Sequence, residues 1–416
     1  MPDTDPNELE GRRLSKKLER LQDYLAADPS NVMLAVETFD AAFALGRLDV
    51  AEHSLAGIAI QAPSAGPVRF RLANLRMAQR RLPEAADLLT QLQRELGSHP
   101  GLAQTRALLH FIEHDFQQCV DTLAPFVDTR SPQWPQTVAQ RATIDGASWA
   151  ELQMLWLRSR HRLGELERAW DWVEEGLATD ALTPAAAGVA CLIALDAGRL
   201  TMIEELARRS GSHPACQQEV LLSMGSLRLQ RQDSPGARQQ LDRALALNDA
   251  DGRVWSMLGF VDMSENRLDH AMVSFARAVA VMPDHAGTWI GLGWTRLLAQ
   301  SPITEAKAAF QVALNLDGNF AESHGCMAVI LAIEGKRQDA LRFIEKARRL
   351  DKRCWSSQFA QMIVNGTAGD KASVQRLAQR LIGSIGSQQS RPASAPRNAQ
   401  GKPPRNAQPR SQRTTH

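Results

Sequence analysis

The chain lacks the cysteine patterns that mark disulfide frameworks and zinc ribbons. Its five cysteines include no C-x-x-C pair, and an odd number cannot all be paired within one chain. We therefore expect buried, reduced thiols and a reducing compartment. These residues are Cys119, Cys191, Cys216, Cys326 and Cys354.

Long apolar runs are also missing. No segment approaches the roughly 20 apolar residues that a membrane-spanning helix needs. The first residues, Met1-Pro2-Asp3-Thr4-Asp5, are polar and acidic, unlike the apolar core of a secretory signal. A cytoplasmic location is therefore the default expectation.

Acidic residues are missing from the end of the chain. The net charge is +2, but residues 384–416 carry six Lys or Arg and no Asp or Glu, so the remainder has a net charge of −4. This stretch has few apolar residues and contains Pro-Arg-Asn-Ala-Gln twice. Such a composition buries too little apolar surface to offset the entropy of ordering it. We predict a disordered basic tail.

The sequence does contain one repeated pattern, which has a 34-residue period. The clearest copy begins at Gly252, and neighbouring copies begin at Gln218 and Ala286. Small residues recur at repeat positions 8 and 20, and large apolar residues at positions 4, 7 and 24. In the clearest copy these are Trp255, Leu258, Gly259, Ala271 and Phe275, followed by Ala278 and Pro283 at positions 27 and 32.

This period predicts paired antiparallel helices that stack into an array. Small side chains at positions 8 and 20, such as Gly259 and Ala271, let the two helices of a unit approach closely. A single pair of this size cannot bury its apolar face, so it must pack on its neighbours. The frame extends outward with weaker copies, and nine begin between residues 32 and 321. Their starts are Val32, Gly66, Pro100, Ala150, Pro184, Gln218, Gly252, Ala286 and Ala321.

The repeat frame also predicts the domain organisation. The step from Pro100 to Ala150 is 50 residues, which indicates an insertion containing Trp134, either docked on the body or offered to a partner. Leucines at helical spacing before residue 28 predict a helix over the N-terminal end. The expected segments are an N-terminal capping helix (1–31), an N-terminal sub-array (32–127), the insertion (128–149), the main array (150–354), C-terminal capping helices (355–383) and the tail (384–416).

The pattern resembles the tetratricopeptide repeat family, most closely over Gly252–His285. The resemblance implies an all-α, right-handed superhelical solenoid of about nine repeats with capping helices at both ends. The chain departs from the family at position 11, where Asp262 and Arg296 replace the favoured tyrosine.

The resemblance implies a concave groove lined by the first helix of each unit. Carried over to this sequence, positions 5, 9 and 12 give a largely apolar C-terminal stretch and a more basic middle. The candidate lining residues are Met154, Arg158, His161, Leu222, Phe260, Met263, Ile290, Trp294 and Leu297. Trp294 is the best single candidate for partner contact, because large aromatics are favoured at binding hot spots.

The same apolar residues have a second interpretation. Phe260, Met263 and Ile290 are equally well explained as core against the next unit. The Lys and Asn pair with which some family members hold a terminal carboxylate is absent here. An amphipathic helix or an extended apolar segment is therefore the expected ligand.

One string has metal-binding spacing. His110-Phe111-Ile112-Glu113-His114 spells H-x-x-E-H, which on an uninterrupted helix places two histidines on one face with a glutamate as base. The string lies at repeat positions 11–15, where the first helix is expected to end, so the pairing is not expected to survive. No third ligand can be singled out. Gly291-Leu292-Gly293 is no phosphate loop, because Arg296 stands where a third glycine is needed.

We therefore expect a non-enzymatic scaffold, adaptor or chaperone without a metal or cofactor, which binds a protein or peptide partner. Two alternatives stay open. One is a nucleic-acid-associated or regulatory factor that uses the basic tail, although the tail lacks aromatic residues for base stacking. The more remote one is a zinc peptidase at His110 and His114.

Overall fold

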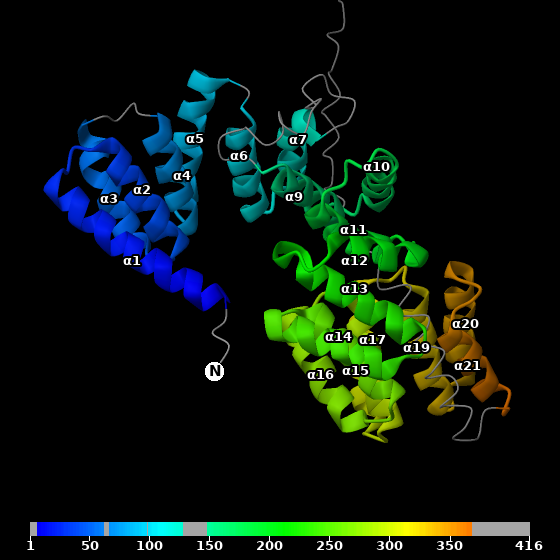
Figure 1. Cartoon of the computed structure of the whole chain (residues 1–416). Coiled ribbons are helices and arrows are strands. Elements are labelled where there is room, and N and C mark those ends of the chain that lie inside the picture. Colours follow the sequence, from blue (N-terminus) through cyan, green and yellow to red (C-terminus); the bar gives the residue numbers. More distant parts are fainter. Residues whose placement is uncertain (1–5, 62–65, 98, 128–147, 368–416) are drawn as a thin grey trace, which may run out of the picture.

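The computed structural model describes residues 6–61, 66–97, 99–127 and 148–367, and regular structure within these ranges is helical (Figure 1). The helices follow one another as successive pairs. Their bounds are α1 Pro6–Ala27, α2 Val32–Ala44, α3 Leu48–Gln61, α4 Gly66–Ala78, α5 Leu82–Leu96, α6 Pro100–Ile112, α7 Phe116–Val127, α9 Trp149–Arg162, α10 Leu166–Ala178, α11 Pro184–Asp196, α12 Ile203–Ser210, α13 Gln217–Gln230, α14 Ser234–Leu247, α15 Gly252–Ser264, α16 Leu268–Val281, α17 Ala286–Leu298, α18 Ile303–Leu316, α19 Ala321–Ile333, α20 Arg337–Leu350 and α21 Trp355–Val364.

The predicted all-α array is confirmed. Nine helix pairs lie between α2 and α20 in the described part of the chain, and their first helices begin at the expected residue or one residue before it. Within a pair the helices pack on each other, and each pair packs on the next. α1 packs on α2, and α21 packs on α19 and α20, so a further helix covers each end of the array. The arrangement is tetratricopeptide-repeat-like.

Three predicted features lie outside the described residues. They are residues 128–147 of the insertion, residues 368–383 of the predicted C-terminal capping segment, and the basic tail. The proposed domain boundaries stay predictions.

Each turn inside a pair contains one residue with left-handed backbone, which ends the first helix and reverses the chain. Four of the nine turns use glycine, as at Gly335 (φ 75°). The other five use residues with a side chain: Arg80, His114, Gln232, Asn266 and Gln300. The conformation is thus common to all repeats, whereas the residue that adopts it is not.

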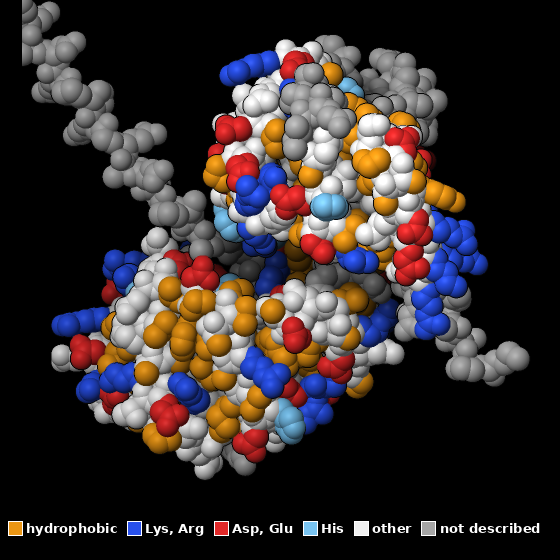
Figure 2. Space-filling model, turned by 90° about the vertical axis from the view of Figure 1, so that its left-hand side faces the viewer, with side chains coloured by type: hydrophobic (Ala, Val, Ile, Leu, Met, Phe, Trp, Pro, Cys, Tyr) orange, Lys and Arg blue, Asp and Glu red, His pale blue; other side chains and the backbone are white. Residues whose placement is uncertain are grey.

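Close helix approach explains the small residues of the repeat. A Cβ atom added at Gly259 would lie 2.8 Å from the ring of Phe275. Ala271 and Phe275 are fully buried between α15, α16 and α17. The interior formed in this way is continuous from α13 to α21. On the face that Figure 2 shows, charged side chains of both signs are mixed with apolar ones.

The departure at position 11 has a structural cause. Asp262 is almost fully buried, where the family favours tyrosine. Its carboxylate accepts hydrogen bonds from Arg238 of the preceding pair (2.6 Å), from Arg267 (3.1 Å) and from Ser274 (3.3 Å). A buried carboxylate is tolerated when its lone pairs are satisfied in this way.

Candidate partner-binding groove

The candidate lining residues lie on α9, α13, α15 and α17, the first helices of their pairs. Three of the nine, Arg158, His161 and Leu297, are partly buried. The remaining six are buried: Met154, Leu222, Phe260, Met263, Ile290 and Trp294. The structure thus brings these residues together along one succession of helices but leaves little of their surface exposed.

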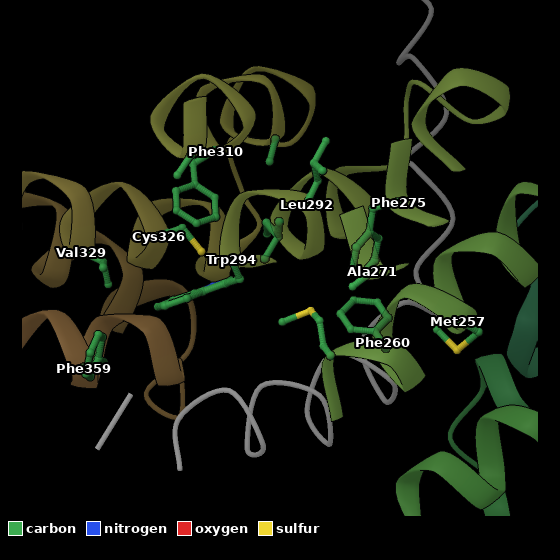
Figure 3. Close-up of a cluster of buried hydrophobic side chains, with 14 of the residues drawn as sticks. Met257, Phe260, Ala271, Phe275, Leu292, Trp294, Phe310, Cys326, Val329 and Phe359 are labelled. Carbon is green, nitrogen blue, oxygen red and sulfur yellow. The ribbon is translucent and has the colours of Figure 1, made fainter. Parts of the chain in front are cut away.

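Trp294 is enclosed by aromatic rings from two other helices. Its ring centroid lies 5.8 Å from that of Phe310 on α18 and 6.1 Å from that of Phe359 on α21 (Figure 3). The side chain is 1% exposed. In this conformation Trp294 contributes to the interior, and its contact with a partner stays a prediction.

Phe260 has a similar position one pair earlier. Its ring meets that of Phe275 edge to face, with centroids 4.9 Å apart. Gly291 of α17 lies against both rings, since a Cβ atom there would fall 3.1 Å from Phe260 and closer still to Phe275. The absence of a side chain at Gly291 therefore allows α17 to pack against these rings, which is a packing role and not a phosphate-binding one.

Burial extends around the whole circumference of these helices. Eight consecutive residues of α15, from Ser256 to Met263, are buried, and so are six consecutive residues of α17, from Ile290 to Thr295. Because a helix turns every 3.6 residues, such runs point in every direction around the axis. The side of α15 and α17 that would face an open groove is thus buried as well.

The middle of the predicted groove is polar but is not a basic patch. Arg158 on α9 donates to the Glu219 carboxylate on α13 at 2.8 Å and to the Ala215 carbonyl at 2.6 Å. His161 lies 2.6 Å from Asp196 at the end of α11. Each positive or titratable group of the predicted patch therefore faces an acidic partner.

A second cation completes this arrangement. Arg253 of α15 binds Asp196 through two nitrogens at 2.7 and 3.0 Å. Burial alone would raise the pKa of Asp196, but the Arg253 charge and the hydrogen bonds from His161 and Arg253 outweigh it and hold that pKa well below its usual range. Asp196 is therefore ionised, and its carboxylate holds His161 and Arg253 in position.

These ion pairs connect units that are not adjacent. α9 and α13 are two pairs apart, and so are α11 and α15. Asp196, Glu219 and Arg253 are not among the groove residues predicted from the sequence. Arg253 lies three residues before position 5 of its repeat, on the same face of the helix as that groove position, and this spacing was the available signal. Its partner lies 57 residues away, a separation that no repeat period marks.

A buried carboxylate also closes the C-terminal end of the array. Glu322 of α19 is 1% exposed and accepts hydrogen bonds from the backbone N–H groups of Trp355 (2.9 Å) and Ser356 (3.3 Å). These groups belong to the first turn of α21, which has no partner for them within the helix. Burial raises the pKa of Glu322, and the hydrogen bonds oppose this rise only in part.

The H-x-x-E-H string does not form a two-histidine face. α6 ends at Ile112, and His114 lies in the following turn with φ 62°. His110 stays on the helix, 3.9 Å from Glu113, whereas the His114 ring packs against Phe116. The expected loss of the i,i+4 pairing is confirmed. Within the described ranges no group of three or more His, Cys, Asp or Glu side chains has a metal-binding arrangement.

The cysteines occupy the interior. All five are free and buried. Burial raises the pKa of the Cys119 thiol to about 11 and that of Cys191 to about 12. Because the thiolate is the reactive form, these side chains have the chemistry of packing residues.

None of the helices in the described ranges is long and apolar enough to span a membrane.

No protein-family model and no curated protein matches the chain. Several solved structures match parts of it. The structure of a MamA point mutant is 21% identical, covering 40% of this chain and 97% of its own, with a TM-score of 0.33. A structure titled as the functional characterization of Pseudomonas aeruginosa PilF is 18% identical, covering 49% of this chain and 95% of its own, with a TM-score of 0.38. At this level the matches carry no information on partners or activity.

Proposed function

We propose that this protein is a non-enzymatic scaffold, an adaptor or chaperone, that binds an apolar helical or extended segment of a partner protein along the first helices of its C-terminal pairs. The cytoplasm is the compartment that fits its buried free cysteines. The observation that carries the proposal is the chemistry of one face. Leu222, Phe260, Met263, Ile290 and Trp294 follow one another across three successive pairs. The charged residues beside them on these helices, Glu219 and Arg253, are already paired with Arg158 and Asp196.

This face favours an apolar ligand for a physical reason. The burial of apolar surface is the main favourable term in such an association, and it contributes about 25 cal/mol per Å². Aromatic anchors such as Phe260 and Trp294 supply large area with few rotatable bonds. Farther along the array the polar side chains are already paired with each other, as Arg158 is with Glu219. They offer fewer free groups to a charged peptide.

A photo-crosslinking amino acid at single positions tests this function in cells of the native host. Leu297 is the groove position of choice, because it is partly buried and its replacement disturbs the core least. Val273, exposed on the outer side of α16, is the matched control. We expect adducts from position 297 and not from 273, with the crosslinked partner peptide apolar on one side.

Adducts from position 273 alone, or from neither position, would contradict groove binding.

The basic tail lies outside the described residues, and its binding to nucleic acid stays a prediction. Removing residues 384–416 separates the two functions. If the protein is a scaffold, the crosslinked adducts at position 297 persist without the tail. If the tail binds nucleic acid electrostatically, its removal abolishes the affinity for nucleic acid and the steep dependence of that affinity on salt.

A further inference from the structure

The outer face of α1 gathers positive charge at the N-terminal end of the array (Figure 1). Leu18 and Leu21 of this helix are buried where it packs on α2. With 3.6 residues per turn, five cations fall within roughly 140° of the helix circumference, outside the arc of these leucines. All five are exposed, and together we call them the basic face: Arg12, Arg13, Lys16, Lys17 and Arg20.

The protein itself leaves most of these charges unpaired. Four of the five cations, all except Arg12, have no ion pair with any described residue. Arg231, for comparison, is also exposed but pairs with Glu204 of α12. The described part of α1 contains two acids, Glu19 and Asp23, so the cations are in excess. Because like charges at this spacing repel one another, an anion with several charges is the ligand that the basic face favours.

An aromatic side chain continues the basic face. Tyr24 lies one turn beyond Arg20 and falls within the same arc of the helix. Its side chain is 59% exposed, whereas every other aromatic side chain in the described ranges is buried or partly buried. Cations that neutralise phosphates, beside a ring on which a base can stack, are the two elements of a binding site for single-stranded nucleic acid.

We propose that the basic face and Tyr24 bind single-stranded nucleic acid. The distance along the helix from Arg12 to Tyr24 is about 18 Å, which is long enough for several successive phosphates. The contacts are to the backbone and to the plane of a base, so recognition is tolerant of sequence. The surface lies on α1, away from the groove of the C-terminal pairs, and it does not depend on the proposed function (Figure 1).

Two other polyanions fit this surface less well. A helix that binds a membrane surface buries its apolar face among the lipids, but the apolar face of α1 is packed on α2. In a nucleic-acid duplex the bases are paired and stacked on each other, which leaves no base for Tyr24. An unpaired strand uses both the charges and the ring.

α20 and the turn after it supply a matched control. Lys346, Arg348 and Lys352 are exposed there and have no ion pair with a described residue. The aromatic side chains of this region are partly buried. K346Q/R348Q/K352Q therefore removes the same charge as K16Q/K17Q/R20Q and leaves the basic face intact.

Fluorescence anisotropy of a labelled oligothymidylate of about 15 nucleotides tests the charges. The full-length protein is titrated at several salt concentrations, and the basic tail is the same in every variant. We expect K16Q/K17Q/R20Q to weaken binding at least about tenfold at low salt. The slope of log affinity against log salt should become shallower by about 2, since each lost phosphate contact contributes about 0.7. K346Q/R348Q/K352Q should bind like the wild type.

Three results of this titration would overturn the proposal. They are a wild type that does not bind the oligothymidylate, an unchanged affinity in K16Q/K17Q/R20Q, and an equal loss in the two triple variants. An equal loss would mean that affinity follows the net charge of the protein and not this surface.

Substitutions of Tyr24 test base stacking separately from charge. We expect Tyr24→Ala to weaken binding about fivefold or more, the smallest effect typical of a lost stacking contact. Its salt slope should equal that of the wild type, because no charge is removed. Tyr24→Phe keeps the ring and should keep the affinity. A Tyr24→Ala protein that binds the oligothymidylate as tightly as the wild type would overturn the assignment.

Vesicles of phosphatidylcholine with about one third phosphatidylserine distinguish a membrane surface from nucleic acid. We expect Tyr24→Ala to leave any sedimentation with these vesicles unchanged while it weakens oligothymidylate binding. If K16Q/K17Q/R20Q loses vesicle binding but retains its affinity for the oligothymidylate, the basic face binds anionic lipid and the proposal is wrong.

Discussion

At the scale of single residues, this array tolerates strained positions where the fold requires one backbone conformation. Gln300 takes φ 58° in the turn between α17 and α18, the place where Gly335 stands two helices later. For a residue with a Cβ atom this conformation costs roughly 1–2 kcal/mol. The turn geometry is imposed by the packing of the two helices and persists despite the local cost.

Gln300→Gly is therefore expected to stabilise the protein by about 0.5–1 kcal/mol, the relief of strain less the extra entropy of glycine in the unfolded chain. The urea midpoint, followed by far-UV circular dichroism, measures it. Gln311→Gly is the control, because Gln311 is exposed inside α18 and glycine there costs about 1 kcal/mol. A destabilised Gln300→Gly protein would show that the side chain has a role that outweighs the strain.

At the scale of the element, the backbone groups in the terminal turns of a helix need hydrogen-bond partners outside that helix. In this array, other repeats supply such partners. The carboxylate of Glu322 satisfies the first turn of α21 from the adjacent α19. The pKa of this group is raised in the folded protein. The unfolded chain therefore releases the proton more readily, and stability falls as the pH rises from the ordinary value of 4.5 through the folded-state pKa.

Glu322→Gln retains an oxygen acceptor but cannot ionise. Relative to the wild type it should gain stability as the pH is raised from about 4 to about 8. Glu322→Ala should lose about 0.5–2 kcal/mol, because the N–H groups of α21 then have no acceptor. Denaturant midpoints of the three proteins at both pH values give the comparison. A Glu322→Gln protein that weakens relative to wild type with rising pH would contradict the assignment.

At the scale of the whole molecule, ion pairs connect units two repeats apart. Arg158–Glu219 and Arg253–Asp196 join α9 to α13 and α11 to α15. We expect contacts of this range to hold the first helices of alternate pairs close and so to help set the curvature of the array. The Arg253 side chain is partly buried, so leaving its charge without a partner also has a cost.

The combined change Asp196→Asn and Glu219→Gln should therefore loosen the array. We expect a larger radius of gyration in X-ray scattering, with the helical signal of circular dichroism nearly unchanged. Glu204→Gln is the control, since Glu204 pairs with Arg231 at an exposed site where an ion pair contributes little. An unchanged radius in the double variant would show that helix packing alone fixes the curvature.

The sequence by itself determined the helix pairs. Their starts at Gly252, Ala286 and Ala321 follow from a local rule, because small residues at fixed positions permit one close approach and the period repeats it. The loss of the His110–His114 pairing follows from the same frame.

Only the tertiary structure decided which groove residues are accessible. The apolar character of Trp294 and Phe260 is visible in the sequence, but their enclosure depends on α21, on α18 and on the approach of successive pairs. The pairing of Asp196 with Arg253 likewise depends on how tightly the array curves. Contacts between elements two repeats apart leave no periodic mark on the chain, since they are set by the summed rotations of the intervening units.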